Sequence, residues 1–353
     1  MKIQRIDQSF VAARSFFYID GEIVSVGDKG KRLMANQMFV EAYFPREQAH
    51  PYPIVMLHGA LQTNMNWLTT PDGRMGFADY FVSKGYAVYL CEQPARGRSD
   101  YHAEVNGGPR RADDIEVIRR RFMSAEDRHP QSKLHSQWPG TAAADFSDPV
   151  DRQFLDAQVE SLPSNAESQR LVLQAVTKLL REIGPAVLMT HSQAGPFGWL
   201  IADACPELVK GIVAMEPFGP PFSTDLQSAA AKSYGIADLP LNYDPPVFAK
   251  EDLKLVLLPS DDPERNSGWV FAEPAPKLPR LAGIPIWLIV SESSYHAGYD
   301  HLTSHVLRQC GVAHEFIRLE DEGIHGNGHM MMLEKNNLEI ADLILGRLLA
   351  AAL

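Results

Sequence analysis

The sequence has few cysteines and no long apolar run. Its 353 residues include only three cysteines, Cys91, Cys205 and Cys310. An odd number of scattered cysteines is typical of a reduced compartment rather than of a disulfide framework. No 18 consecutive residues are apolar, and residues 1–20 lack the apolar block of a signal peptide. We therefore expect a cytoplasmic protein that does not enter a membrane.

Positive charge is also scarce. The chain has 33 Lys and Arg residues against 44 Asp and Glu residues, a net charge of −11. Nucleic-acid binding depends on clustered basic side chains. The one basic run, residues 119–121, is short and has Glu116 and Glu126 nearby. We interpret this run as a solvated helix face and expect no nucleic-acid partner.

Metal and nucleotide motifs are missing as well. There is no Cys-x-x-Cys pair, and the histidines show no metal-ligand spacing with cysteines or carboxylates. No Gly-x-Gly-x-x-Gly follows a predicted strand. We therefore expect no metal and no cofactor.

Strand-like and helix-like segments alternate along the chain, after two short β-prone pieces at 16–19 and 37–44 that predict an antiparallel lead-in. Such alternation favours right-handed crossovers and a parallel sheet. The sequence thus predicts one α/β domain over residues 1–353, with a mostly parallel sheet flanked by helices. Strands are expected at 53–57, 86–90, 187–189, 211–215, 284–290 and 315–319, and helices at 75–85, 165–183, 194–205, 299–310 and 331–349.

Two long stretches interrupt this alternation. Residues 100–160 are polar and contain proline and glycine, and residues 217–281 are rich in proline. A stretch of this length between regular elements is usually either a functional lid or disordered. We predict that both are lid or cap insertions.

The most informative segment surrounds Ser192. An apolar strand-like run ends there, and the small residues Ala194, Gly195 and Gly198 follow. This pattern is typical of a nucleophile elbow, in which a sharp turn between strand and helix exposes a serine hydroxyl. The usual motif is Gly-x-Ser-x-Gly, and here Thr190 and Ala194 occupy the glycine positions. The alternative is that Ser192 only caps the following helix.

A serine nucleophile needs a histidine base, and His329 is the leading candidate. It follows the last predicted strand, and two glycines nearby allow its loop to approach the serine. His325, four residues earlier, is the alternative base. His191 is expected to shape the site. His58 and His296 are expected to be structural or to line the pocket.

The acid of the triad is predicted to be Glu216, with Glu292 and Asp300 as alternatives. All three follow strands whose carboxyl ends should meet at one edge of the sheet. Glu216 ends a strand that should be wholly buried, where an unpaired charge is costly. That position favours Glu216.

The transition state also needs hydrogen-bond donors for its oxyanion. The backbone N–H of Gln193, directly after the nucleophile, is one predicted donor. The second is the N–H of Ala60, with Leu61 as the alternative. The side chains predicted to bind substrate are bulky and lie in loops near the serine: Leu61, Trp138, Phe218 and Tyr295.

In the order of these motifs, the chain resembles the α/β-hydrolase family. His58 and Gly59, residues 97–99, Ser192 and the late His329 carry this resemblance, which covers about residues 37–350. The segments 70–76, 137–140 and 326–330 look like those of a branch of bacterial and fungal serine esterases whose acid is a Glu after the sixth strand. This closer resemblance implies an α/β-hydrolase fold and a Ser192–Glu216–His329 triad.

The predicted function is hydrolysis of a small carboxylic ester with an apolar group, through an acyl-enzyme. A lactonase, an amidase or a carbon–carbon bond hydrolase would use the same residues. Epoxide hydrolases and dehalogenases would need a carboxylate in place of Ser192. A second class remains open, a non-catalytic protein that binds small molecules in a capped pocket. The sequence leaves the oligomeric state open, a homodimer included.

Overall fold

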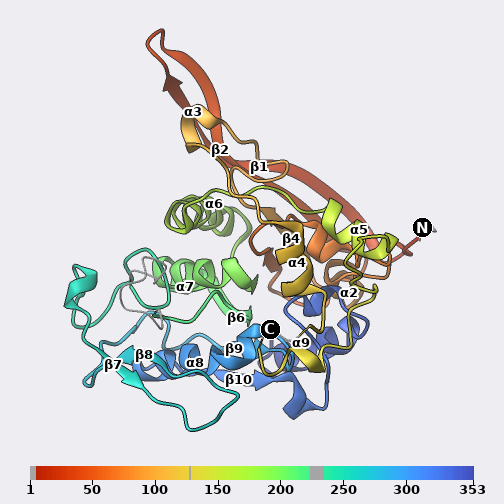
Figure 1. Ribbon diagram of the computed structural model, residues 1–353. Coiled ribbons are helices and arrows are strands. Elements are labelled where there is room, and N and C mark those ends of the chain that lie inside the picture. Colours follow the sequence, from red (N-terminus) through yellow and green to blue (C-terminus); the bar gives the residue numbers. More distant parts are fainter. Residues whose placement is uncertain (1–4, 127–128, 223–233) are drawn as a thin grey trace.

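One eight-stranded sheet runs through the molecule, with helices on both faces (Figure 1). The computed structural model describes residues 5–126, 129–222 and 234–353. From one edge to the other the strands are β1 (Val11–Val26), β2 (Lys31–Pro45), β4 (Val88–Glu92), β3 (Ile54–Leu57), β5 (Ala186–His191), β6 (Val209–Met215), β9 (Ile286–Val290) and β10 (Glu315–Arg318). From β4 to β10 all neighbours are parallel, whereas β2 pairs antiparallel with β1 and β4. The predicted α/β fold with a mostly parallel sheet is confirmed.

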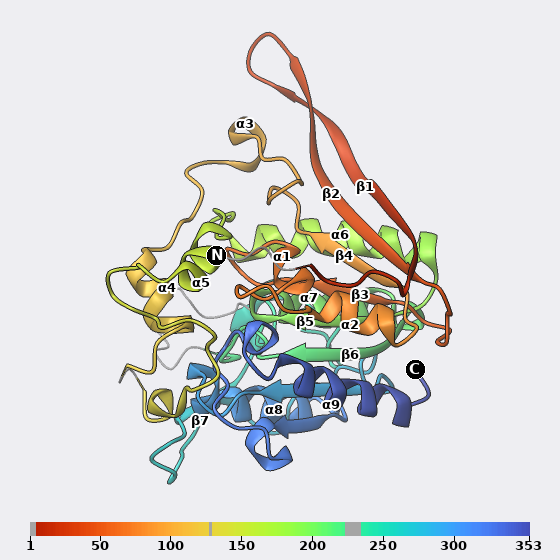
Figure 2. The same ribbon diagram turned by 90° about the vertical axis from the view of Figure 1, so that its right-hand side faces the viewer.

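The parallel strands separate two apolar cores, because successive side chains of a strand point to opposite faces. Ile54 and Met56 of β3 belong to one core, and Val55 and Leu57 belong to the other. This double burial explains why these strands are continuous apolar runs in the sequence. The first core lies under α2 (Phe77–Ser83) and α9 (Asn337–Ala350), the second under α6 (Asn165–Ile183), α7 (Gly195–Ala204) and α8 (Asp300–Gln309) (Figure 2).

Strands β1 and β2 form a hairpin that projects from the body of the molecule (Figures 1 and 2). They contain 16 and 15 residues, much longer than the two short pieces that the sequence predicted. The turn contains Gly27 and Gly30, whose φ angles of +65° and +63° favour glycine. The outer part pairs Ile23 with Met34 and Ser25 with Arg32, and the side chains of Ile23 and Met34 are more than half exposed, so no buried face indicated its length.

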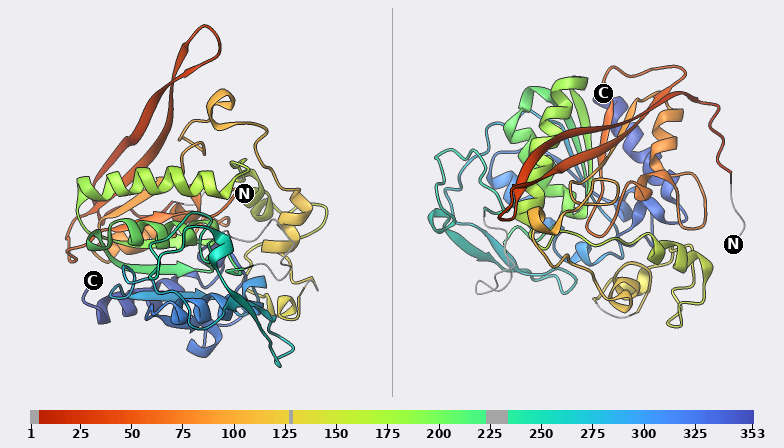
Figure 3. Two further views of the ribbon diagram at one scale, coloured as in Figure 1. Left: turned by 90° about the vertical axis from the view of Figure 1, so that its left-hand side faces the viewer. Right: turned by 90° about the horizontal axis from the view of Figure 1, so that it is seen from above.

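The two interruptions contain short elements outside the main sheet (Figure 3). Residues 127–128 of the first and 223–233 of the second lie outside the described residues. That the interruptions act as lids stays a prediction. Their elements are α3 (Ala103–Asn106), α4 (Ile115–Phe122) and α5 (Pro149–Asp156) in the first, and the two-stranded sheet of β7 (Leu255–Leu258) and β8 (Gly268–Phe271) in the second.

Candidate active site

Ser192 sits at a sharp turn directly after β5 and before α7. Its φ is +55°, a left-handed conformation that is uncommon for residues other than glycine. Such strain persists only where the surrounding structure enforces it. Here the N–H of Phe218 donates to the carbonyl oxygen of Ser192 at 2.7 Å and ties the turn to the end of β6. The segment has the geometry expected of a nucleophile elbow.

Glycines make room for this turn. A Cβ on Gly195 would lie 2.2 Å from Cβ of Pro217, and one on Gly59 would lie 3.0 Å from Cβ of Ser192. Thr190, which occupies a usual glycine position, turns its methyl group toward Gly198, where a Cβ would be 3.3 Å away. The missing side chain of Gly198 thus accommodates the larger residue in the strand.

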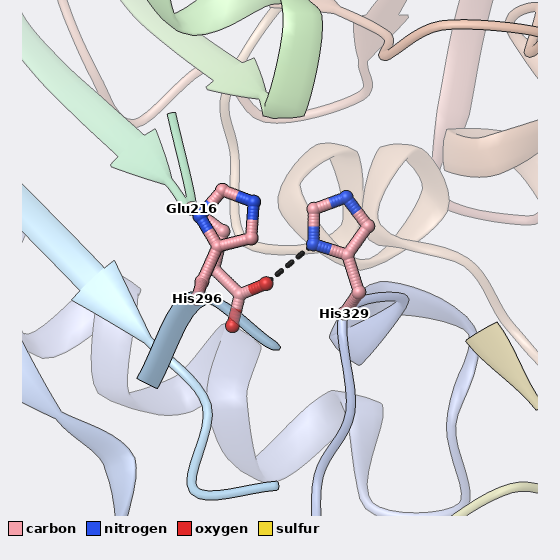
Figure 4. Close-up of side chains that lie close together, drawn as sticks. All are labelled: Glu216, His296 and His329. Atoms are coloured by element: carbon pink, nitrogen blue, oxygen red, sulfur yellow. Dashed lines mark hydrogen bonds and ion pairs between the residues drawn. The ribbon is translucent and has the colours of Figure 1, made fainter. Parts of the chain in front are cut away.

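The structure brings Glu216 and His329 together (Figure 4). Nδ1 of His329 donates to Oε2 of Glu216 at 2.5 Å, and both side chains are almost fully buried. The Glu216 carboxylate also accepts hydrogen bonds from the N–H of Ser291 at 2.8 Å and from Oγ of Ser294 at 2.7 Å. These donors hold the carboxylate and leave Nε2 of the imidazole to face the cavity.

The alternative pair lies elsewhere. His325 contacts Glu292 at 3.1 Å, and its side chain is 62% exposed. The Glu292 carboxylate also accepts the N–H of Gly326 at 2.7 Å. Glu292 therefore pairs with the exposed histidine of this loop and Glu216 with the buried one.

Two further histidines support His329 from its sides. Nε2 of His191 lies 2.9 Å from the carbonyl oxygen of His329 and fixes its backbone. The ring of His296 stacks on that of His329, with centroids 4.8 Å apart, while its Nδ1 lies 3.1 Å from both carboxylate oxygens of Asp300. Asp300 thus contacts His296 and not His329, the predicted base. The expectation that His191 shapes the site agrees with this contact.

Ser192 and His329 line one cavity that opens to solvent. Among the described residues, no hydrogen bond joins Oγ of Ser192 to a neighbouring side chain, and Nε2 of His329 lies 3.4 Å from Oη of Tyr295. Catalytic hydrogen bonds are often long or poorly aligned before substrate binds. The structure thus shows the acid–base contact, with the serine in the same cavity.

Burial controls the charge of the acid and the base. It lowers the pKa of His329 well below its ordinary value, and the neighbouring His296 and Arg121 act in the same direction. It raises the pKa of Glu216, and His296 and Ser294 oppose this rise. His329 is consequently uncharged at neutral pH, the state in which Nε2 can accept a proton.

The residues of the two predicted oxyanion donors, Gln193 and Ala60, line the same cavity as Ser192. Gln193 follows it in the first turn after β5, where backbone N–H groups have no partner within the turn. The N–H of Ala60 donates to no other described group, whereas that of Leu61 donates to Oγ of Ser161 at 3.2 Å. Ala60 therefore fits the role better than the alternative, Leu61.

Sequence reasoning missed Arg96, which is 2% exposed and lies beneath this region. Its Nη1 donates to the carbonyl oxygens of Gly59 and Gln62, both at 3.2 Å. Its Nη2 donates to Oε1 of Gln193 at 3.3 Å. One guanidinium therefore holds the loop that contains Ala60 and the residue after Ser192. No motif spacing indicates such a contact, because it joins three separate loops.

Three of the four predicted pocket residues line the cavity, namely Leu61, Phe218 and Tyr295. Trp138 does not, and this expectation needs correction. Its Nε1 donates to Asp151 at 2.7 Å, and its ring packs against Phe154, behind the cavity wall. At this side of the cavity the lining residue is Phe122 of α4. Its ring stacks on that of His329, with ring centroids 5.4 Å apart.

Among the described residues, one group has ligand atoms close enough to hold a metal ion. Glu216, His296 and His329 offer atoms within 4.8 Å of one another. They come from three different loops, which is why sequence spacing did not indicate them. Glu216 and His329 already bind each other, and Nδ1 of His296 binds Asp300. Each of these three side chains thus has a hydrogen-bonding partner among the protein groups.

Comparison with known proteins places this chain in a family. Residues 54–343 match the profile of the "Alpha/beta hydrolase family". The chain belongs to the alpha/beta hydrolase family. This hydrolase is 41% identical over 338 residues to a "Probable secreted lipase phiG" of Fungal sp. (strain ATCC 74256), covering 94% of this chain and 88% of that protein. It also shares its fold with "The Atomic Resolution Structure of a Novel Bacterial Esterase", at a TM-score of 0.68, 23% identity and full coverage of both chains.

The comparison corrects the expected location of this hydrolase. The fungal relative is described as secreted, which points outside the cell and contradicts the cytoplasmic location inferred from the cysteines and from residues 1–20. The inference failed because a chain of 353 residues can bury a large core and needs no disulfides in any compartment. No described helix has the length and apolar character needed to cross a membrane.

Proposed function

We propose that this alpha/beta hydrolase cleaves a carboxylic ester through an acyl-enzyme. The observation that carries the proposal is the buried contact between Glu216 and His329 in the cavity that also contains Ser192. The relative described as a lipase supports ester cleavage, because lipases hydrolyse carboxylic esters. The substrate is a small molecule.

The reaction begins when the Ser192 hydroxyl rotates toward Nε2 of His329. His329 takes the hydroxyl proton while Oγ attacks the ester carbonyl carbon, and Glu216 stabilises the imidazolium that forms. The carbonyl oxygen becomes an oxyanion that accepts the N–H groups of Ala60 and Gln193. His329 then gives its proton to the leaving alcohol oxygen. Water repeats the sequence on the acyl-enzyme and releases the acid and free Ser192.

Arg96 acts as a positioning residue in this proposal. It touches neither substrate nor Ser192, but it holds the carbonyl groups of Gly59 and Gln62 and the side chain of Gln193. Donors that are fixed before the reaction need no reorganisation as charge develops. Its buried positive charge also favours the oxyanion.

Leu61, Phe218 and Tyr295 are proposed to contact the acyl or alcohol group.

We propose that residues 1–353 form a single domain and that the first interruption, residues 100–160, is a lid. Four of its described residues line the cavity: Arg111, Asp113, Arg121 and Phe122. The second, residues 217–281, contributes only Phe218 among its described residues.

Replacing Ser192 with Ala tests the proposal. Turnover of short-chain nitrophenyl esters should fall by a factor on the order of 10⁶. Purified wild-type protein should also be labelled at Ser192 by a fluorophosphonate, and heat-denatured protein should not. Undiminished turnover by the Ser192→Ala variant would refute the role of this serine.

The other reactions open to the same residues differ in the bond that is cleaved. A panel of matched esters, lactones, amides and β-diketones separates them by kcat/KM. A non-catalytic binding protein would retain a small molecule without labelling at Ser192.

A further inference from the structure

The short basic run at residues 119–121 does not form the solvated helix face expected from the sequence. Its three arginines at the end of α4 have different surroundings. Arg119 is buried and binds Glu116 and Glu126. Arg120 is exposed, with Nε 3.5 Å from Glu126. Arg121 lines the cavity of Ser192.

The guanidinium of Arg121 has unused donors. The nearby Asp113 accepts two hydrogen bonds from Arg111, at 3.1 and 3.0 Å, and so is already paired. Arg121 comes only within 4.0 Å of the same carboxylate, and no described residue accepts a hydrogen bond from it. Its guanidinium carbon instead lies 5.9 Å from the ring centre of Phe122 and 5.7 Å from that of Tyr295.

The charge around the cavity is positive although the chain is acidic. Two arginines, Arg111 and Arg121, and one carboxylate, Asp113, line it, which gives 2 − 1 = +1. The lining histidines are His191 and His329, and burial lowers the pKa of both well below the ordinary value. The whole chain carries −11. An anionic substrate is therefore repelled by the net charge of the whole chain but attracted by the positive charge that lines the cavity.

We propose that Arg121, with Arg111 beside it, binds a free carboxylate of the substrate, so that the preferred substrates are esters that carry a second, ionised acid group. This inference rests on the proposed ester hydrolysis. A guanidinium presents paired N–H donors that match the two oxygens of a carboxylate. The rings of Phe122 and Tyr295 beside Arg121 keep water from one side of this contact, which strengthens it. The apolar part of the substrate would lie between the carboxylate and the scissile bond, against Leu61.

Matched pairs of substrates test the inference. The first pair places the charge on the acyl side. It compares the p-nitrophenyl monoester of glutarate or adipate with the same compound whose free carboxylate is converted to a methyl ester. The second pair is the butyrate ester of 4-hydroxybenzoate against that of methyl 4-hydroxybenzoate, which places the charge on the alcohol side. Spontaneous hydrolysis is subtracted. All rates are measured at pH 8, above the ordinary pKa of histidine, so that a change in the pKa of His329 has the least influence on them.

The variants are Arg121→Gln and Arg121→Glu, with Arg120→Gln as the control on the same helix. We expect wild-type protein to have the higher kcat/KM for the acid member of at least one pair. This ratio of acid to neutral substrate should fall about 10- to 100-fold in Arg121→Gln, as for the loss of a hydrogen bond to a charged group. It should fall further in Arg121→Glu and stay unchanged in Arg120→Gln. Added salt should also lower the wild-type ratio.

The two proposals fail in different ways. If neutral esters are hydrolysed and Ser192 is labelled but neither acid substrate is preferred, the carboxylate site is wrong and the esterase stands. The same conclusion follows if Arg121→Gln changes kcat/KM for the acid and the neutral member of each pair by the same factor. If no ester is cleaved and Ser192 is not labelled, the esterase proposal itself is wrong.

Discussion

Two residues with left-handed backbones lie at the ends of neighbouring strands. Ser192 follows β5 with φ +55°, and Glu216 follows β6 with φ +43°. Each such conformation costs about 1–3 kcal/mol and persists where packing enforces it. Here the N–H of Glu216 donates to Ile289 of β9, and that of Phe218 donates to Ser192. The sheet thus holds two of the three side chains of the proposed triad in fixed directions.

The identity of the acid is testable by two equivalent substitutions. Glu216→Gln keeps the shape of the side chain but removes the charge that stabilises the imidazolium, so kcat should fall about 10⁴-fold. Glu292→Gln is the matched control, because Glu292 also contacts a histidine and a backbone N–H. Its steady-state kcat on a nitrophenyl ester should equal that of the wild type. The reverse order of effects would make Glu292 the acid.

The pH dependence follows from the burial of His329. Burial favours its neutral form, so more acid than usual is needed to protonate it. The acid limb of kcat/KM for a neutral ester should therefore lie below pH 6.5, the ordinary pKa of histidine. In Arg121→Gln the limb should move to higher pH, because a neighbouring positive charge is lost. A limb at or above pH 6.5 in the wild type would contradict the buried, neutral base.

Arg96 should affect kcat more than KM, because the donors it holds bind the oxyanion and not the ground-state ester. We expect Arg96→Met to lower kcat about 10²-fold, similar to the loss of one oxyanion donor, and Arg96→Lys to restore part of it. Arg98→Met is the control. Arg98 lies in the same loop but binds Glu41 and Glu92, away from Ser192. Equal loss of kcat in Arg96→Met and Arg98→Met would indicate a merely structural effect.

At the scale of elements, two helical glycines should respond oppositely to alanine. Gly195 begins α7, where a Cβ would collide with Pro217, so Gly195→Ala should cost about 1–3 kcal/mol in the free energy of unfolding and disturb Ser192. Gly346 lies on the exposed side of α9 with nothing near a new Cβ. Gly346→Ala should stabilise by about 0.4–1 kcal/mol. Urea unfolding measures both.

The sequence predicted elements well where apolar burial dictates them. The parallel strands and α6 appeared as expected because both faces of the sheet are buried. The last helix was predicted from residue 331 but begins at Asn337, because the apolar residues 331–333 form a buried 3-10 turn that has no distinct pattern. Ser192, Glu216 and His329 could be proposed as a triad because each follows a predicted strand. The contacts of Arg96 and the place of Arg121 in the cavity lining could not be predicted, because they depend on how distant loops meet.

At the scale of the whole molecule, stability should not depend on redox conditions. All three cysteines are free and buried, and burial raises the pKa of Cys310 to about 12. Thiolate is therefore scarce and shielded. The melting temperature should be the same with and without a reductant, and a thiol reagent should titrate three groups only after unfolding. Rapid reaction of the native protein would contradict this burial.

The order of the proposed triad along the chain has a practical consequence. Ser192 and Glu216 directly follow adjacent central strands, whereas His329 comes from a loop 113 residues beyond Glu216 in sequence. A stoichiometric acylating inhibitor will thus react only with molecules in which the carboxyl-terminal third has docked onto the middle of the chain. Counting the inhibitor bound per chain would measure the correctly assembled fraction of any preparation, including one recovered from denaturant.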